Sequence, residues 1–123
     1  MINIAAIFIG GGLGSLCRYG ISKLSLSLFT NQFPLGTLIS NVLSCIILAL
    51  SVLYFNGKIS GNMALKLFLI TGFCGGFSTF STFSFETVEL IKTGNTAIAL
   101  LNIAISVVVG VGLIFFLLRN QVQ

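Results

Sequence analysis

The sequence has no histidine, no aspartate and only two acidic residues, Glu86 and Glu89. Its three cysteines (Cys17, Cys45 and Cys74) lie far apart in the chain, within apolar segments. A His/Cys metal cluster, a Ser-His-Asp triad and a paired-carboxylate hydrolase site are therefore unsupported. The six Lys and Arg residues are scattered, as is typical of anchors at lipid headgroups. We predict that the protein is not an enzyme and has no nucleic-acid partner.

Apolar residues dominate what remains. They make up 56% of the chain against 7% charged residues, and the mean hydropathy is +1.13. Soluble domains carry about a quarter charged residues. The 123 residues can hold about four spans of the roughly 20 residues needed to cross a lipid bilayer. The N-terminus lacks the basic region and cleavage site of a secretory signal, so we expect the first apolar stretch to stay as a span. We predict an all-α membrane protein with one four-helix domain, residues 1–123.

Hydropathy places the four spans at about residues 3–29, 35–55, 62–91 and 96–118, with turn chemistry at 31–34, 56–61 and 92–95. The basic residues divide equally between the two sides of the membrane: Arg18, Lys23 and Lys92 on one side, and Lys58, Lys66 and Arg119 on the other. An equal division selects no orientation and permits insertion both ways, from which an antiparallel two-fold dimer would follow.

The first span is rich in glycine. Gly10 and Gly14, and likewise Gly11 and Ser15, are spaced so that small residues form neighbouring strips on the helix surface. Such strips let two helices approach closely in lipid, either within one subunit or between two copies. Arg18 lies one turn beyond Gly14. A charge at this position either extends to the headgroups or faces a wet vestibule that attracts anions.

Two other spans carry polar stripes. Asn102, Ser106 and Gly110 follow one another at steps of four in the fourth span. The second span has a fuller stripe on one helical face, formed by Thr37, Ser40, Asn41, Ser44 and Ser51. Interhelical hydrogen bonding accounts for most single Ser and Thr residues in membranes. A primary amide in mid-span is more costly to bury without partners, so we predict that Asn41 faces a pathway.

The third span contains Gly72, Gly75 and Gly76 near its middle, which indicates a break in the helix. Irregular backbone at that depth is tolerated only where protein encloses it. Carbonyls freed around Gly75 and Ser78 could coordinate Na⁺, as in other discontinuous membrane helices. The alternative is a glycine kink whose free groups are satisfied by Ser and Thr side chains.

Beyond the break, Phe80, Phe83, Ser84 and Thr87 share one helix face, while another carries Thr79, Thr82, Glu86 and Glu89. An aromatic ring has a positive edge, so a phenylalanine presented edge-on favours an anion. Hydroxyl hydrogens beside such edges can replace part of an anion's lost hydration without a full charge. Sites of this weak kind suit passage rather than tight binding. The pattern predicts an intramembrane polar path for an anion.

Three segments together resemble a known family. TGFCGGFSTFSTFSFE (residues 71–86), GTLISN (36–41) and GGGLGSLCRY (10–19) are similar to the motifs of the Fluc/CrcB family of small fluoride channels, and the resemblance covers essentially the whole chain. It implies a multi-pass protein of the bacterial inner membrane that passively exports fluoride and so lowers cytoplasmic toxicity. It also implies an antiparallel, dual-topology homodimer with two pores and one central Na⁺, which is structural and not transported.

The resemblance also implies roles for individual residues. Phe80 and Phe83 would present ring edges to fluoride, with Asn41 as an amide donor beside them. The remaining positions would be hydroxyl groups on or near the path at Thr37, Ser81, Thr82 and Ser106, a vestibule charge at Arg18, and Na⁺ ligands at the backbone carbonyls of Gly75 and Ser78. Three positions depart from the family pattern: Ser78 replaces a common Thr, Asn102 stands where some members have Tyr, and Gly110 stands where a hydroxyl is frequent.

Two other functions are compatible with four short spans. A small dual-topology, proton-coupled drug transporter needs a titratable carboxylate deep in the membrane. Glu86 and Glu89 instead lie toward one end of the third span. A non-transporting assembly subunit would use the small-residue faces only as contact surfaces for other helices.

Overall fold

The computed structural model describes residues 1–30, 32–56 and 61–121 as an all-helical bundle. Its elements are α1 (Ile2–Leu28), α2 (Leu35–Phe55), α3 (Met63–Lys66), the π-helical stretch η1 (Leu67–Cys74), α4 (Gly75–Phe77), α5 (Phe80–Lys92) and α6 (Thr96–Leu118). They form four segments long and apolar enough to cross a membrane, which confirms the predicted helical membrane class. Lys58 and the parts of the predicted turns at residues 31 and 57–60 lie outside the described residues.

The helix ends follow local turn chemistry. Pro34 directly precedes α2, where its fixed φ suits a helix start. The side chain of Asn62 caps α3 by accepting a hydrogen bond from the Leu65 amide at 3.3 Å. After α5, Gly94 adopts a φ of +84°, a conformation that glycine reaches at little cost, and the chain turns into α6. These signals set the ends of the membrane segments.

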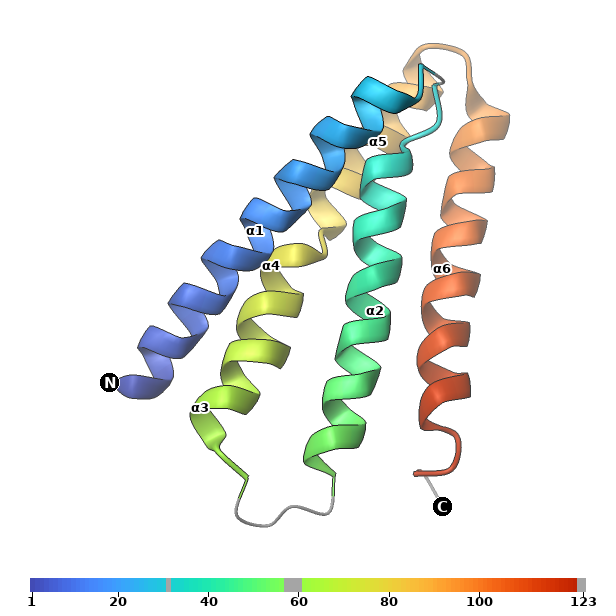
Figure 1. The fold of residues 1–123 in the computed structure, drawn as a ribbon. Helices are drawn as coiled ribbons and strands as arrows, with labels where there is room; N and C mark the ends of the chain where they lie inside the picture. Colours follow the sequence, from blue (N-terminus) through green and yellow to red (C-terminus); the bar gives the residue numbers. More distant parts are fainter. Residues whose placement is uncertain (31, 57–60, 122–123) are drawn as a thin grey trace.

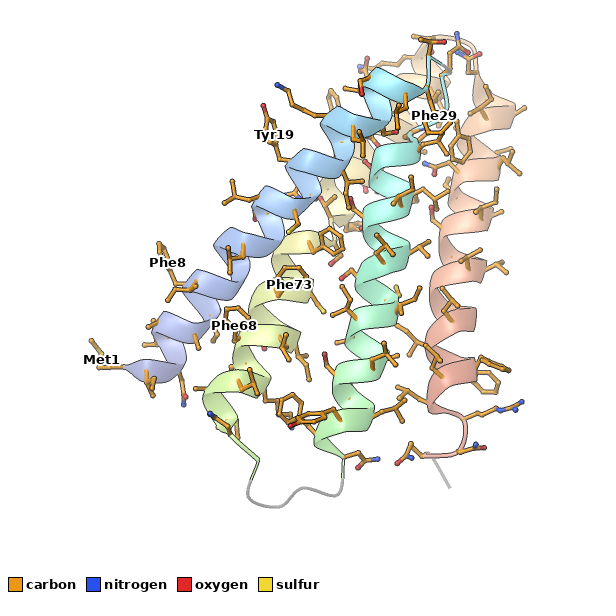
Figure 2. All side chains as sticks on the ribbon, viewed as in Figure 1. Met1, Phe8, Tyr19, Phe29, Phe68 and Phe73 are labelled. Atoms are coloured by element: carbon orange, nitrogen blue, oxygen red, sulfur yellow. The ribbon has the colours of Figure 1, made fainter. Side chains whose placement is uncertain are left out.

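In the bundle, α1 runs along the first half of the third segment, and α6 packs beside both α2 and α5 (Figure 1). The start of α1 and the end of α6 lie at the same end of the bundle. Large apolar side chains cover the outside: Phe8 is 81% exposed and Tyr19 60% exposed, and both project away from the neighbouring helices (Figure 2). Such a surface suits contact with lipid acyl chains.

A seam of glycines joins α1 to the third segment. A Cβ atom added to Gly14 would lie 2.8 Å from the Phe77 amide nitrogen, and one added to Gly72 would lie 2.9 Å from the carbonyl oxygen of Ile7. Gly10 and Gly76 are equally crowded by backbone of the facing helix. The glycine strip of α1 therefore serves close helix packing within the subunit.

Candidate functional site

The third segment breaks at Ser78 and Thr79, where the backbone is extended with ψ angles of 158° and 121°. Gly75 and Gly76, which predicted the break, themselves remain helical. The break is made instead by the two hydroxyl residues that follow. The Thr79 hydroxyl caps α5 by accepting a hydrogen bond from the Thr82 amide at 3.2 Å. The sequence located the break, but Gly72 and Gly76 are required for close packing against α1, whereas a Cβ atom at Gly75 would meet nothing within 4 Å.

Side chains donate to carbonyls in the last turn of the helix before the break. The Cys74 carbonyl accepts hydrogen bonds from the hydroxyls of Ser44 (3.0 Å) and Ser78 (2.7 Å). Arg18 donates from Nε to the Gly76 carbonyl at 3.1 Å. A guanidinium is favourable there because the carbonyl ends of a helix carry partial negative charge. The half-buried Arg18 is thus tied to the broken helix, and its predicted vestibule role remains a prediction.

Asn41 spans the break by pairing with both backbone groups of Thr79. The Thr79 amide donates to Asn41 Oδ1 at 2.8 Å, and Asn41 Nδ2 donates to the Thr79 carbonyl at 3.3 Å. A primary amide has two N–H donors and only one is used here. Asn41 therefore stabilises the break and keeps one donor for another partner.

A groove of about 290 Å³ lies against the break. It is formed by α2, the extended residues, the start of α5 and the middle of α6, and it is lined by Asn41, Cys45, Ser78, Thr79, Phe80, Phe83, Ser106 and Val107. All eight lining residues are uncharged. The rings of Phe80 and Phe83 are 6.1 Å apart between centroids and inclined at 40°. The groove thus brings together four residues of the predicted pore, Asn41, Phe80, Phe83 and Ser106.

The start of α5 gives this groove a favourable field for an anion. The amide groups of the first helical turn carry partial positive charge, and they lie where Phe80 begins the helix beside the groove. A neutral groove with amide, hydroxyl and aromatic groups can hold an anion weakly without fixing it by a full charge.

Three other predicted path residues do not line this groove. Thr37 is buried and donates from its hydroxyl to Glu86 Oε1 at 2.8 Å, and both line a separate pocket of about 110 Å³. Ser81 is exposed, with its hydroxyl 3.4 Å from that of Thr79. Thr82 takes part in the α5 cap through its backbone. Their predicted roles along the path remain predictions.

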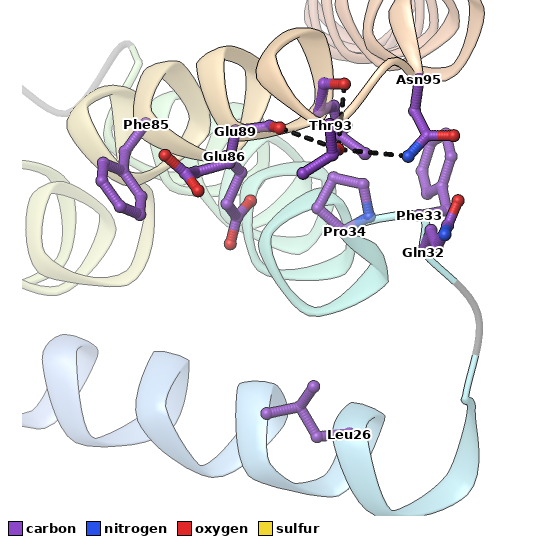
Figure 3. A pocket seen from close by; sticks show the side chains of 10 residues that line it. Leu26, Gln32, Phe33, Pro34, Phe85, Glu86, Glu89, Thr93 and Asn95 are labelled. Carbon is purple, nitrogen blue, oxygen red and sulfur yellow. Dashed lines mark hydrogen bonds between the residues drawn. The ribbon is translucent and has the colours of Figure 1, made fainter.

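The two carboxylates lie in a larger pocket of about 530 Å³ near the end of the bundle where α1 meets α2 and α5 meets α6 (Figure 3). Thr93 donates to the Glu89 carbonyl at 2.9 Å, and Asn95 donates to the Thr93 hydroxyl at 3.2 Å. Glu86 is half-buried, and its second oxygen, Oε2, has no hydrogen-bond partner in the part of the chain that the structure describes. Sequence analysis missed the link between Glu86 and Thr37, although each was assigned to a polar helix face.

The polar track of α6 is short. Asn102 is 1% exposed and does not line the groove; its Oδ1 accepts a hydrogen bond from the Ser106 hydroxyl at 3.3 Å. A Cβ atom on the buried Gly110 would meet Cys45 Sγ at 3.4 Å. Of the three predicted positions on α6, only Ser106 therefore brings a polar side chain to the groove.

The break also creates potential cation ligands. In a continuous helix the Gly75 carbonyl would bond the Thr79 amide, and the Ser78 carbonyl would bond the Thr82 amide. Asn41 and the Thr79 hydroxyl take these amides instead, and no described residue donates to either carbonyl. Uncharged backbone oxygens are suitable ligands for Na⁺. The described residues contain no cluster of three or more His, Cys, Asp or Glu side chains that could hold a metal.

Comparison with known proteins identifies the family. Residues 5–118 match the family described as "CrcB-like protein, Camphor Resistance (CrcB)". The chain belongs to the CrcB family. A CrcB relative from Coxiella burnetii, named "Fluoride-specific ion channel FluC", is 41% identical over 107 residues, which cover 86% of each chain. Proteins of the same name from Dehalococcoides mccartyi and Pyrococcus abyssi are 40% and 44% identical, over 94% and 89% of this chain and 88% and 87% of their own lengths.

Proposed function

We propose that this protein is a fluoride-selective channel that passively exports fluoride across the bacterial inner membrane and so lowers its toxicity in the cytoplasm. The observation that carries the proposal is the uncharged groove at the helix break, which combines the Asn41 amide, the Ser106 hydroxyl and two phenylalanine rings. CrcB relatives with about 40% identity are named fluoride-specific ion channels.

The chemistry of the groove suits fluoride. Fluoride is small, strongly hydrated and able only to accept hydrogen bonds, so a path must offer donors in place of water. Asn41 has one N–H left after it has paired with Thr79. The rings of Phe80 and Phe83 and the first amides of α5 add partial positive charge. Because these groups are neutral, the ion can leave as readily as it enters.

The functional unit in this proposal is an antiparallel, dual-topology homodimer with two pores. Phe80 lines the groove and yet is 80% exposed in the single chain. An ion path cannot lie open to acyl chains, because a polar route through lipid must be enclosed by protein. A second copy related by a two-fold axis in the membrane plane would enclose both grooves, and the equal division of basic residues permits that arrangement.

The dimer would hold one structural Na⁺ through the free carbonyls of Gly75 and Ser78. A bound cation would supply positive charge that offsets the partial negative charge of these carbonyls. Replacement of Na⁺ by K⁺ in the purified protein is expected to lower the thermal stability of the dimer. An unchanged melting temperature would count against the cation.

The competing functions lack a matching feature in the groove. A proton-coupled drug transporter would need a carboxylate in its binding site, whereas Glu86 and Glu89 line other pockets. An assembly subunit would use the glycine strip of α1 for a partner, whereas Gly10 and Gly14 already pack against this chain's own third segment.

Reconstitution of the purified protein tests the proposal. Proteoliposomes loaded with fluoride and chloride are diluted into a medium without either ion, and efflux is followed with ion-selective electrodes. We expect rapid fluoride release and retention of chloride, and no release of either ion from liposomes that lack the protein. Equal efflux of the two ions would reject a fluoride channel, and absence of flux from the pure protein would favour an assembly subunit. Reporter tags on the C-terminus should be detected on both sides of the membrane.

A further inference from the structure

The most deeply buried polar side chain of α6 does not line the groove. Asn102 is 1% exposed, and its Nδ2 has no hydrogen-bond partner among the described residues. A buried amide donor without a partner is costly, commonly by an amount equal to a hydrogen bond. Among the described residues, its side chain makes one hydrogen bond, through Oδ1, which accepts from the Ser106 hydroxyl one turn further along the helix. Asn102 is thus connected to the groove through one hydroxyl group.

The direction of that hydrogen bond matters for an anion. A serine hydroxyl has one proton and two lone pairs. Because Ser106 donates its proton to Asn102, the free side of its oxygen carries only lone pairs. Lone pairs repel an anion, so Ser106 in this arrangement cannot serve as a donor in the groove that it lines.

Rotation of the amide reverses the direction. The oxygen and nitrogen of a primary amide have nearly the same size, so a half-turn of the Asn102 amide exchanges them with little change in packing. Nδ2, which now has no partner, would then donate to the Ser106 oxygen, and the hydroxyl proton would be free for an anion. Oδ1 would lose its partner instead, so each state leaves one amide atom unpaired.

We propose that Asn102 is a positioning residue that aims the Ser106 hydroxyl, and that an anion in the groove selects the rotated amide. The inference rests on the proposed function and deepens it, because it adds a residue behind the path that determines whether α6 offers a donor. The proposed change reverses the direction of one hydrogen bond and involves no covalent step.

A double-mutant cycle tests the proposal by fluoride efflux from proteoliposomes. In Asn102→Leu, the Ser106 hydroxyl is expected to turn to a carbonyl of its own helix, and efflux should fall roughly tenfold, the effect of one lost hydrogen bond. Fluoride efflux through Ser106→Ala should fall by a similar factor, and efflux through the double variant should be no slower than through Ser106→Ala alone. Ser40→Ala is the matched control, because Ser40 is fully buried in α2 and its hydroxyl has no hydrogen-bond partner among the described residues.

A spectroscopic readout separates positioning from a purely structural role. In the wild-type protein labelled with ¹⁵N, the Asn102 side-chain amide resonance should shift as fluoride is added and should not shift with chloride. In Ser106→Ala the fluoride-induced shift should disappear, since the link to the groove is gone. This measurement needs no substitution at Asn102 and therefore holds even if Asn102→Leu fails to fold.

The outcomes are distinguishable from failure of the proposed function. A wild-type protein that releases no fluoride would overturn the channel itself. A conducting wild type in which Asn102→Leu conducts normally, or in which the two substitutions multiply to roughly a hundredfold loss, would overturn only the role of Asn102. The role of Asn102 would likewise be overturned if its side-chain amide resonance did not shift on addition of fluoride.

Discussion

The two halves of the third membrane segment use opposite kinds of surface. The first half, from Met63 to Phe77, lies backbone against backbone on α1 through Gly72 and Gly76. The second half, α5, instead presents phenylalanine rings and capping hydroxyls at a groove. The change occurs where the sequence passes from glycines to alternating hydroxyl and aromatic residues. A single span can therefore be a packing element at one end and part of a polar site at the other.

This difference separates stability from conduction. The glycine seam fixes where the first half ends, and that position determines where Thr79 begins α5. Asn41 then ties α2 to the break through the backbone of Thr79. Bulky substitutions in the seam should remove the folded protein, and substitutions of the α5 rings that line the groove should reduce conduction alone. Substitution of Asn41 should reduce both stability and conduction.

The largest effect is expected at the seam. Gly14→Val places methyl groups where even a Cβ atom would collide with backbone of Phe73 and Phe77. Backbone cannot move aside as a flexible side chain can, so the expected loss of stability is about 3 kcal/mol or more. We expect little monodisperse protein on size-exclusion chromatography and a much lower melting temperature.

Gly12→Ala is the matched control in the same helix, because a Cβ atom at Gly12 meets nothing within 4 Å. This substitution should be neutral or should stabilise the helix by about 0.5–1 kcal/mol. If Gly14→Val were as stable as Gly12→Ala, the seam would not hold the two helices together.

Asn41 should show both effects. Asn41→Ala removes two hydrogen bonds to Thr79, and we expect a loss of about 1–3 kcal/mol in stability. The loss of a preorganised donor to the anion should also reduce fluoride efflux roughly a hundredfold. Asn41→Asp places a carboxylate at the groove, where its charge would repel an anion and is costly to bury, so conduction should fall at least as far. Equal melting temperatures for wild type and Asn41→Ala would contradict the bridging role.

An intermediate effect, on conduction alone, is expected at the rings. Phe80→Ile removes an exposed aromatic ring from the groove and should reduce fluoride efflux about fivefold, because a favourable ring contact contributes about 1 kcal/mol. Phe83→Ile should behave similarly. Phe85→Ile is the control: Phe85 lies in the same helix and is 66% exposed, but it lines the pocket with the carboxylates. Equal losses in all three variants would mean that the groove is not the path.

The sequence predicted features that depend on neighbours along the chain. Hydropathy located the four spans, and the glycines together with Ser78 indicated the break. It did not predict which side chains meet across helices, since this depends on helix rotation and depth. Asn41 was expected to face an ion and also pairs with backbone, whereas Thr37 is directed to Glu86. The role of Gly76 was misassigned because flexibility and close packing both favour glycine.

The smallest effect is expected at Glu86. Glu86→Gln keeps an oxygen that can accept the hydrogen bond from Thr37, and the residue lies outside the groove. Fluoride efflux should therefore stay within about twofold of wild type, the change expected for a substitution worth less than about 0.5 kcal/mol. It should also proceed without a proton gradient, since passive flow of an anion through a neutral groove requires no titrating group. Loss of efflux in Glu86→Gln, or a need for a proton gradient in the wild type, would contradict passive flow. It would indicate that the second half of the third segment takes part in proton-coupled transport.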